Sequence, residues 1–395
     1  MILYNDLNCC NCNGCVQTCP KEAISVKTSK EGFCYPFIDN SKCVDCGLCQ
    51  KVCAWQHIDE TNEVRDCYVA INNNKSQLLK SASGGIFSAV ATEILNRGGI
   101  VFGASLSVTD GEFNIRHIWI DDIVDLPKLQ GSKYVQSNIG VSFIEVKKFL
   151  LEGKEVLFSG TPCQCAALKA FLRKDFRNLY LIDLICHGVP NQQFFNDYIK
   201  YEYPGKELRN FKFRDKSKGW ELTGQLVLDS GKKISVPAGI SSYYTLFLDA
   251  QTYRENCYSC KYADDRRPGD ITIGDYWGIE KQHPELVRQG VINARDGVSC
   301  IIVNTSKGAN LVEAVKPGLS IYNSEYDKIA VRNAQLKHPM KKGAFRDEIF
   351  KIYAEQGYKG VDSFYKKNYK KTRIIHSILK LLPYSVKSFL RKHKP

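Results

Sequence analysis

The sequence predicts a mixed α+β and α/β fold class, with a small cysteine-rich N-terminal domain, a larger mixed α/β domain and a basic helical C-terminal tail. Three observations predict this arrangement. Residues 1–57 are dense in cysteine and have little regular periodicity. From Cys67 onwards, apolar runs of strand length alternate with segments of helical periodicity, which is the pattern of an α/β domain. The last 30 residues contain ten Lys and Arg and no Asp or Glu.

The elements of the α/β domain follow from apolar spacing and turn residues. Apolar side chains recur at helical spacing within residues 86–96. The turn residues Asp229-Ser-Gly231 predict a hairpin within residues 211–236. In chain order we expect a strand at 67–72, a turn at 81–85, a helix at 86–96, a strand at 99–106, a helix at 141–152, a strand at 155–159, a helix at 163–173, a strand at 179–185 and the hairpin.

Composition limits the class of protein. Of 395 residues, 44% are hydrophobic and 25% are charged, as in ordinary soluble globular proteins. No apolar run reaches the roughly 18 residues that a membrane-spanning helix needs, and residues 1–8 lack the features of a secretory signal. The 17 cysteines are clustered and too few for a disulfide scaffold, which indicates metal ligation in a reducing cytosol. We therefore expect a cytoplasmic protein.

The positive charge is concentrated at the C-terminus. The formal net charge is +13, and the tail accounts for all but +3 of it. This distribution argues against a general nucleic-acid-binding surface, and we expect no nucleic-acid partner.

A four-cysteine motif with x2, x2 and x3 spacing occurs twice in the N-terminal domain, beginning at Cys9 and at Cys43. Three closely spaced thiolates can each reach a different iron of one cubane, and the fourth iron takes a cysteine from the other motif. Zinc favours cysteine pairs separated by a longer loop. The segment resembles bacterial two-[4Fe-4S] ferredoxins. We assign Cys9, Cys12, Cys15 and Cys53 to one cluster, and Cys43, Cys46, Cys49 and Cys19 to the other.

A second cysteine set lies in the α/β domain: Cys163, Cys186, Cys257 and Cys260. Cys163 and Cys186 each follow an expected strand, at the end where open α/β sheets place ligand sites. Cys257 and Cys260 would complete a four-thiolate site. The residues alone leave three interpretations open, namely zinc, a third iron–sulfur cluster and buried free cysteines.

Six short motifs occur in a fixed order, and together they resemble the coenzyme F420 hydrogenase/dehydrogenase beta subunit family over about residues 1–305. They are Ser81-Ala-Ser-Gly-Gly85, Gly131-Ser-Lys-Tyr-Val-Gln-Ser137, Gly160-Thr-Pro-Cys-Gln164, Asp183-Leu-Ile-Cys-His-Gly188, Cys257-Tyr-Ser-Cys260 and Gly269-Asp-Ile-Thr-Ile-Gly-Asp-Tyr-Trp277. The resemblance implies an FAD and a third [4Fe-4S] cluster, held by Cys163, Cys186, Cys257 and Cys260. Cys165, in the same motif as Cys163, is an alternative ligand. The expected domains are a two-[4Fe-4S] ferredoxin domain at 1–60, two parts of a beta-subunit-like domain at 66–150 and 151–330, and a helical basic tail at 331–395.

The resemblance also suggests where the FAD lies. The turn Ser83-Gly84-Gly85 precedes an expected helix, whose N-terminal amides suit a pyrophosphate; by itself such a turn is more often an N-cap and loop. Lys133 either balances phosphate or reduced-flavin charge or is a solvated surface lysine. The expected FAD contacts are Ser83, Gly84, Gly85, Gly131, Ser132, Lys133, Tyr134, Gln136 and Ser137.

Two further residues are candidates for the chemistry. His187, next to Cys186, is the candidate catalytic residue, either protonating a substrate or tuning the cluster; the alternative is a packed core histidine. Asp275 follows an expected strand and either faces the site or merely ends the strand.

The C-terminal tail has helical apolar spacing among its basic residues. Such a segment indicates binding to a membrane surface at the inner face of the membrane, or a helix docked on the body or on a partner. The apolar positions are Ile374, Ile375, Ile378, Leu379 and Leu382, continued after Pro383 by Val386, Phe389 and Leu390.

These observations predict a flavo-iron–sulfur oxidoreductase. Electrons from a partner such as ferredoxin would pass through the ferredoxin domain and the third cluster to FAD, and then to a hydride-accepting substrate. The family resemblance suggests a deazaflavin-like substrate, and the basic tail suggests a lipid-linked intermediate of surface polysaccharide. A second hypothesis is an electron-delivery subunit that docks on a catalytic partner and has no substrate of its own. A third is a protein whose clusters only staple the fold.

Overall fold

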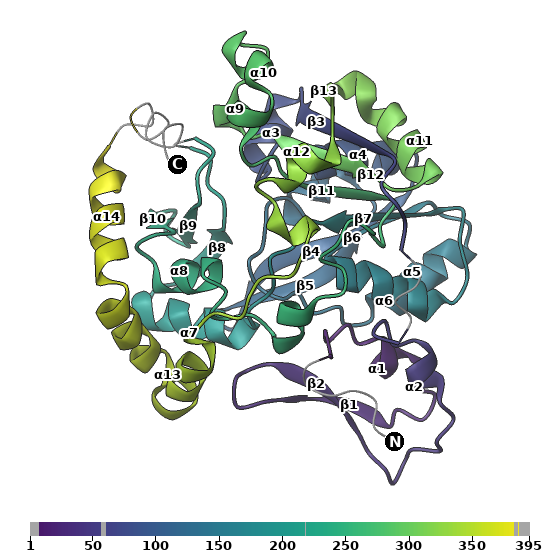
Figure 1. Cartoon of the computed structure of the whole chain (residues 1–395). Helices are drawn as coiled ribbons and strands as arrows, with labels where there is room; N and C mark the ends of the chain where they lie inside the picture. Colours follow the sequence, from purple (N-terminus) through teal and green to yellow (C-terminus); the bar gives the residue numbers. More distant parts are fainter. Residues whose placement is uncertain (1–7, 57–60, 218, 383–385, 387–395) are drawn as a thin grey trace.

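The computed structural model describes residues 8–56, 61–217, 219–382 and 386, and it contains a large mixed sheet, a smaller antiparallel sheet and an N-terminal hairpin (Figure 1). The large sheet has the strand order β13-β3-β12-β11-β7-β6-β4-β5. Neighbouring strands from β11 to β4 run parallel, and the flanking strands pair antiparallel. The strands are β3 (Asp66–Asn72), β4 (Ile100–Thr109), β5 (Glu112–Ile120), β6 (Val156–Gly160), β7 (Leu179–Leu184), β11 (Ile271–Asp275), β12 (Ser299–Val303) and β13 (Leu319–Ser324).

Helices cover both faces of the large sheet because successive side chains of its strands point to opposite faces. Val101 of β4 packs with α4 (Ile86–Asn96) and α11 (Ser306–Val315), whereas Phe102 packs with α5 (Ser142–Leu151) and α6 (Pro162–Leu172). The further short helices of this part are α3 (Lys75–Lys80), α9 (Ile279–Gln282), α10 (Pro284–Arg288) and α12 (Tyr326–Ala330).

A second layer packs beside the large sheet around an aromatic core. It contains the three-stranded sheet β10-β9-β8 and the helices that surround it, at the left of Figure 1. Its elements are β8 (Leu208–Lys212), β9 (Thr223–Leu228), β10 (Lys233–Pro237), α7 (Gln192–Glu202), α8 (Ser242–Leu248) and α13 (Arg346–Asn368).

The N-terminal domain is a small cysteine-rich unit below the large sheet in Figure 1. It comprises α1 (Gly14–Thr18), the antiparallel strands β1 (Ile24–Thr28) and β2 (Cys34–Ile38), and α2 (Leu48–Lys51). The β1–β2 turn reaches the second layer, where the Phe33 ring lies 5.5 Å from that of Phe350. On the other side, the Gln17 side chain accepts hydrogen bonds from the backbone of Phe143 and Ile144 at the start of α5.

The expected fold class is confirmed, and the expected elements agree with the structure to within a few residues. The helix expected at 86–96 is α4, and the hairpin around residues 229–231 is formed by β9 and β10. The expected strands at 67–72, 99–106, 155–159 and 179–185 are β3, β4, β6 and β7. The expected helices at 141–152 and 163–173 are α5 and α6.

The region expected as a tail divides into a docked part and an exposed part. Helix α13 buries Ile349, Tyr353, Val361 and Tyr365 in the aromatic core, and its regular geometry is interrupted at Gly357, which has a φ of +64°. Helix α14 (Lys370–Leu381) follows, and its Ile374, Ile375 and Ile378 side chains are more than half exposed. Pro383, Phe389 and Leu390 lie outside the described residues. Within the described part, no helix is both long and apolar enough to span a membrane.

Candidate functional site

The ferredoxin cysteines form two separate groups in the combination that the spacing predicts. Burial raises the pKa of the Cys15 thiol, and the neighbouring thiols of Cys12, Cys9 and Cys53 raise it further. We call these four the inner cysteine group, because the two segments that carry them contact the body through the carbonyls of Cys9 and Ala54. Cys19, Cys43, Cys46 and Cys49 line one small pocket at the far end of the domain, where Cys46 is exposed. These four are the outer cysteine group.

The cysteines of the α/β domain also come together. Because β6 and β7 are parallel neighbours, Cys163 in the first turn of α6 and Cys186 after β7 lie at the same edge of the sheet. Burial raises the pKa of the Cys186 thiol to about 12, and the Cys163 and Cys260 thiols contribute to this shift. The Cys257 thiol likewise has the other three thiols among its electrostatic neighbours. We call these four the third cysteine group.

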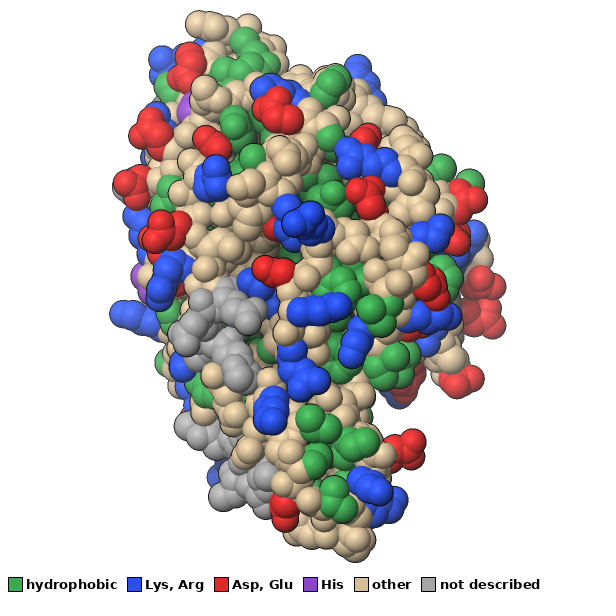
Figure 2. Space-filling view, turned by 90° about the vertical axis from the view of Figure 1, so that its right-hand side faces the viewer, with side chains coloured by type: hydrophobic (Ala, Val, Ile, Leu, Met, Phe, Trp, Pro, Cys, Tyr) green, Lys and Arg blue, Asp and Glu red, His purple; other side chains and the backbone are tan. Residues whose placement is uncertain are grey.

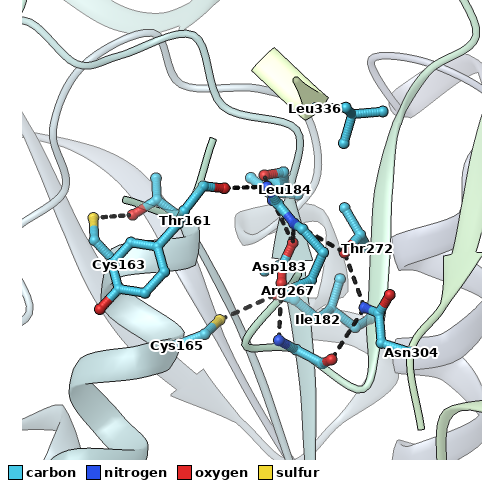
Figure 3. A network of polar contacts seen from close by, with 12 residues as sticks. Thr161, Cys163, Cys165, Ile182, Asp183, Leu184, Arg267, Thr272, Asn304 and Leu336 are labelled. Atoms are coloured by element: carbon cyan, nitrogen blue, oxygen red, sulfur yellow. Dashed lines mark hydrogen bonds and ion pairs between the residues drawn. The ribbon is translucent and has the colours of Figure 1, made fainter. Parts of the chain in front are cut away.

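Cys165 does not belong to the third cysteine group. It is fully buried, and its thiol donates to the carbonyl of Ile182 at 3.5 Å. Cys163, two residues earlier on α6, has its sulfur 3.2 Å from Thr161 Oγ1 and lines the cavity. Figure 3 shows the two sulfurs in these separate surroundings. The structure therefore places Cys163, and not Cys165, at the wall of the cavity.

A buried ion pair holds the segments that carry Cys186 and Cys260. Asp183 Oδ1 accepts from Arg267 Nη2 at 2.7 Å, and the side chains are 0% and 1% exposed (Figure 3). Arg267 also donates to the carbonyls of Leu184 and Tyr262. The ion pair thus connects two segments. One is β7, which leads to Cys186, and the other is the segment that follows Cys260.

The predicted flavin residues surround one cavity of about 340 Å³, a volume in the range of small-molecule sites. Cys163, Cys186 and Cys257 open into the same cavity. Of the nine expected FAD contacts, only Gly84 is absent from the wall. A Cβ at Gly84 would lie 2.4 Å from the Ala70 carbonyl oxygen, so this glycine is required for packing against β3. The contacts that line the cavity are Ser83, Gly85, Gly131, Ser132, Lys133, Tyr134, Gln136 and Ser137.

The N-terminus of α4 faces this cavity without a side-chain cap. Gly85 occupies the N-cap position with a φ of +82°, a conformation that favours glycine. The preceding turn is fixed by Ser83 Oγ, which donates to the Val298 carbonyl at 2.8 Å, and by Lys216 Nζ, which donates to the Ser83 carbonyl at 2.7 Å. The uncapped amides and the nearby ammonium group suit an anionic group.

Lys133 belongs to the cavity wall and is not a solvated surface lysine. Its Nζ donates to the carbonyls of Leu129 and Gln130 at 3.1 and 2.9 Å. Burial lowers its pKa to about 7. An anionic ligand in the cavity would favour the charged ammonium form.

Gln136 and Ser137, expected to offer hydrogen bonds to the flavin, are already engaged with protein. Gln136 Nε2 donates to the Cys10 carbonyl at 2.7 Å. Ser137 Oγ lies 2.8 Å from His117 Nδ1, and His117 Nε2 lies 3.0 Å from the Ser159 carbonyl oxygen. Because a carbonyl only accepts, Nε2 carries the proton and Ser137 donates to Nδ1. Burial lowers the pKa of His117 to about 4, which keeps this ring neutral.

His187 and Asp275 both face the cavity. No described residue hydrogen-bonds the His187 ring, and burial lowers its pKa while Asp275 acts in the opposite direction. Asp275 accepts from Arg214 Nη1 at 2.9 Å and from Trp220 Nε1 at 3.0 Å. Asp275 is therefore part of the cavity wall with its charge neutralised by Arg214. The His187 ring, in contrast, is free to hydrogen-bond a ligand in the cavity.

Sequence reasoning missed Cys10, His117, Arg214 and Arg254, which also line the cavity. Cys10 lies between two cysteine groups, since hydrogen bonds to the thiols of Cys12 and Cys163 raise its pKa. None of these residues lies in a spaced motif of its own. The position of Cys10 inside the first ferredoxin motif was the one feature of the sequence that could have indicated its place beside the cysteine groups.

Comparison with known proteins agrees with this geometry. Residues 8–56 match the 4Fe-4S dicluster domain, so the chain is an iron–sulfur electron-transfer protein. Residues 153–328 match the family described as the C terminus of the coenzyme F420 hydrogenase/dehydrogenase beta subunit. The chain therefore combines a 4Fe-4S dicluster domain with a region similar to the C terminus of this beta subunit family, the family that the six motifs resemble.

Among solved structures, the chain is similar to one from the xenon derivatization of the F420-reducing [NiFe] hydrogenase complex from Methanosarcina barkeri. The identity is 16% and the TM-score 0.43, over 78% of this chain and 94% of that chain. No curated protein matches the chain.

Proposed function

We propose that the chain is an iron–sulfur flavoprotein oxidoreductase that passes electrons from two ferredoxin clusters through a third cluster to FAD, and from there to a hydride-accepting substrate. The observation that carries the proposal is the position of Cys10. Its thiol interacts with Cys12 of the inner group and Cys163 of the third group, and it also lines the cavity. Two predicted electron-carrying centres and the predicted flavin site therefore meet at one point.

The third cysteine group fits a cubane better than zinc. Across residues 8–56, 61–217 and 219–382, no three Cys, His, Asp or Glu side chains converge closely enough to hold one metal ion. Four thiolates on zinc would each lie about 2.3 Å from a single ion, whereas a cubane takes each thiolate on a different iron.

The cavity residues fit a flavin nucleotide. The uncapped N-terminus of α4 and Lys133 supply the positive environment for its pyrophosphate. When bound, the flavin would exchange single electrons with clusters and transfer them in pairs as hydride. The protein would bind and orient the nucleotide and exclude water, while His187 would donate a proton.

The anaerobically purified chain is expected to contain about 12 iron atoms and one flavin. Elemental analysis and flavin extraction measure both quantities on the same sample. Zinc in place of iron at the third cysteine group would contradict the cluster assignment, and iron without flavin would favour an electron-delivery subunit.

Replacement of His187 by Asn tests the proposed proton donor. A histidine donates only in its protonated form, and its pKa is lowered from the ordinary 6.5 by burial. The rate of proton-dependent reoxidation of the reduced flavin by a soluble quinone should therefore fall as the pH rises through a value below 6.5. The variant should lower that rate about 10²-fold and lose this pH dependence. An unchanged pH profile would assign His187 to packing.

The substrate we propose is a deazaflavin-like coenzyme or a lipid-linked intermediate of surface polysaccharide. An assay that supplies reduced ferredoxin and each candidate in its oxidised form distinguishes the two, because only the substrate of this chain would be reduced.

The outer cysteine group is the proposed entry point for electrons from reduced ferredoxin. Cys46 is exposed there, and the adjacent Val44 side chain is 59% exposed. Figure 2 shows hydrophobic side chains gathered at this lower end of the molecule.

An exposed apolar patch favours the second candidate, an electron-delivery subunit that docks on a catalytic partner. Trp119 lies on the edge strand β5 and donates to Glu145 of α5 at 3.3 Å. Ile144 and Leu151 of α5 are also exposed. Substrate turnover by the isolated chain would exclude this candidate.

Helix α14 is proposed to contact an anionic membrane surface. Its exposed isoleucines follow Lys370, Lys371 and Arg373 along the helix, and a basic amphipathic helix binds in the lipid interface. Replacing Ile378 by Ser should weaken co-sedimentation with phosphatidylglycerol vesicles about tenfold, because burying an Ile side chain contributes about 1.5–3 kcal/mol. The control is Leu79→Ser, at a comparably exposed residue of α3. Equal binding by both variants would contradict the proposal.

A further inference from the structure

Arg254 is fully buried where the ferredoxin domain, the third cysteine group and the cavity meet. Its Nε donates to the Cys9 carbonyl at 2.7 Å, and Nη2 donates to the Cys34 carbonyl. Nη1 donates to Gln136 Oε1 at 3.5 Å. One side chain therefore joins the inner cysteine loop, strand β2 and the cavity wall.

The backbone of Arg254 is tied to the third cysteine group. Its N–H donates to the carbonyl of Val189, three residues after Cys186, at 2.9 Å. Its own carbonyl accepts from the N–H of Cys257, also at 2.9 Å. Arg254 thus contacts, through different atoms, segments that carry the inner cysteine group and segments that carry the third cysteine group.

The positive charge of Arg254 lacks a carboxylate partner among the described residues. Its guanidinium lies 4.3 Å from the ring of Tyr35 and 5.5 Å from that of Phe33. A buried charge is costly unless opposite charge compensates it. A cubane with four thiolates carries net negative charge, which would supply that compensation in the loaded protein.

Arg346 provides a contrast at the same interface. It is also buried, but it pairs with Glu31 at 2.8 Å and with Glu255 and Asp347 at 3.3 Å. Its charge is therefore neutralised within the protein. Variants of the two arginines can therefore be compared. Both residues contact the ferredoxin domain, but only Arg254 carries a charge without a carboxylate partner among the described residues.

We infer that Arg254 is a positioning residue that fixes the inner cluster against the third cluster and raises the reduction potentials of both. The inference rests on the proposed function. Cluster potentials depend on net charge, hydrogen bonds and solvent exposure, and a buried cation favours the reduced form, which carries one more negative charge. The transfer is balanced without bond changes, because one electron leaves the inner cluster and enters the third.

Redox titration of the anaerobic holoprotein, followed by electron paramagnetic resonance, tests the inference with three variants. Arg254→Gln removes the charge, Arg254→Lys keeps the charge without the planar fork, and Arg346→Gln removes a neutralised charge. We expect Arg254→Gln to reduce the reduced-to-oxidised ratio of the inner and third clusters about tenfold at a fixed potential, a shift of about 59 mV to more negative potential. Arg254→Lys should remain near wild type, as should the outer cluster in every variant.

Unchanged midpoint potentials in Arg254→Gln would overturn the inference, as would an equal shift in Arg346→Gln. If Arg254→Gln fails to take up clusters, Arg254→Lys decides: potentials near wild type support the role of the charge, and shifted potentials refute it. A wild-type protein with only about eight iron atoms would refute the third cluster instead. The inner-cluster potential would then still test Arg254.

Discussion

Replacement of Asp183 by Asn is expected to destabilise the α/β domain by about 3–5 kcal/mol, because it leaves Arg267 as an uncompensated charge in the interior. Both side chains are almost completely buried, and Asp183 Oδ2 also accepts from the Gly269 N–H at 2.8 Å. The effect is measured as a lower midpoint of thermal unfolding, since a chain of several domains need not unfold in a single two-state step.

The same substitution should release the third cluster before the ferredoxin clusters. Arg267 fixes the chain on either side of that site through the carbonyls of Leu184 and Tyr262. Glu313→Gln is the control, because Glu313 pairs with Lys316 at an exposed position where a salt bridge contributes about 0–1 kcal/mol. A wild-type unfolding midpoint in Asp183→Asn would show that the ion pair does not stabilise the fold.

Replacement of Cys163 by Ala is expected to remove the third cluster, lowering the iron content from about 12 to about eight atoms per chain. Electron flow from the ferredoxin domain to the flavin should then stop, because the centre between them is missing. Iron analysis and single-turnover flavin reduction measure the two effects. Ala is used because a serine oxygen can replace a thiolate as a ligand.

Cys165→Ala is the matched control for this experiment. Cys165 lies two residues further along α6, but its thiol faces the core and donates to the Ile182 carbonyl. We expect this variant to keep all its iron and to lose only the packing of a small buried side chain. Loss of the third cluster in Cys165→Ala, with retention in Cys163→Ala, would reverse the ligand assignment.

The ferredoxin domain was the most predictable part of the molecule. Its ligands lie within two short loops, so their spacing in the chain limits how the thiols can be arranged. The structure separates the inner and outer groups in the combination that the spacing predicts, with Cys53 beside Cys9, Cys12 and Cys15. The six family motifs were equally informative, because all of them lie at the cavity or beside it.

Parts of the proposed flavin site were not predictable, because the hydrogen-bond partners are distant in the chain. Gln136 and Ser137 have suitable side chains, but Cys10 and His117 already engage them. Lys133 could have been solvated, and only its surroundings show an amine buried beside two carbonyls. Helical spacing likewise did not reveal that α13 packs into the aromatic core while α14 keeps its isoleucines exposed.

The sequence by itself determined the class of protein, the element positions and the cysteine inventory, because these depend on local spacing and periodicity. The tertiary structure decided which cysteine of α6 faces the third site and which charges are left without partners. Arg254 shows the reason. Its contact with the Cys9 carbonyl joins residues 245 positions apart, and no local pattern constrains a contact across that separation.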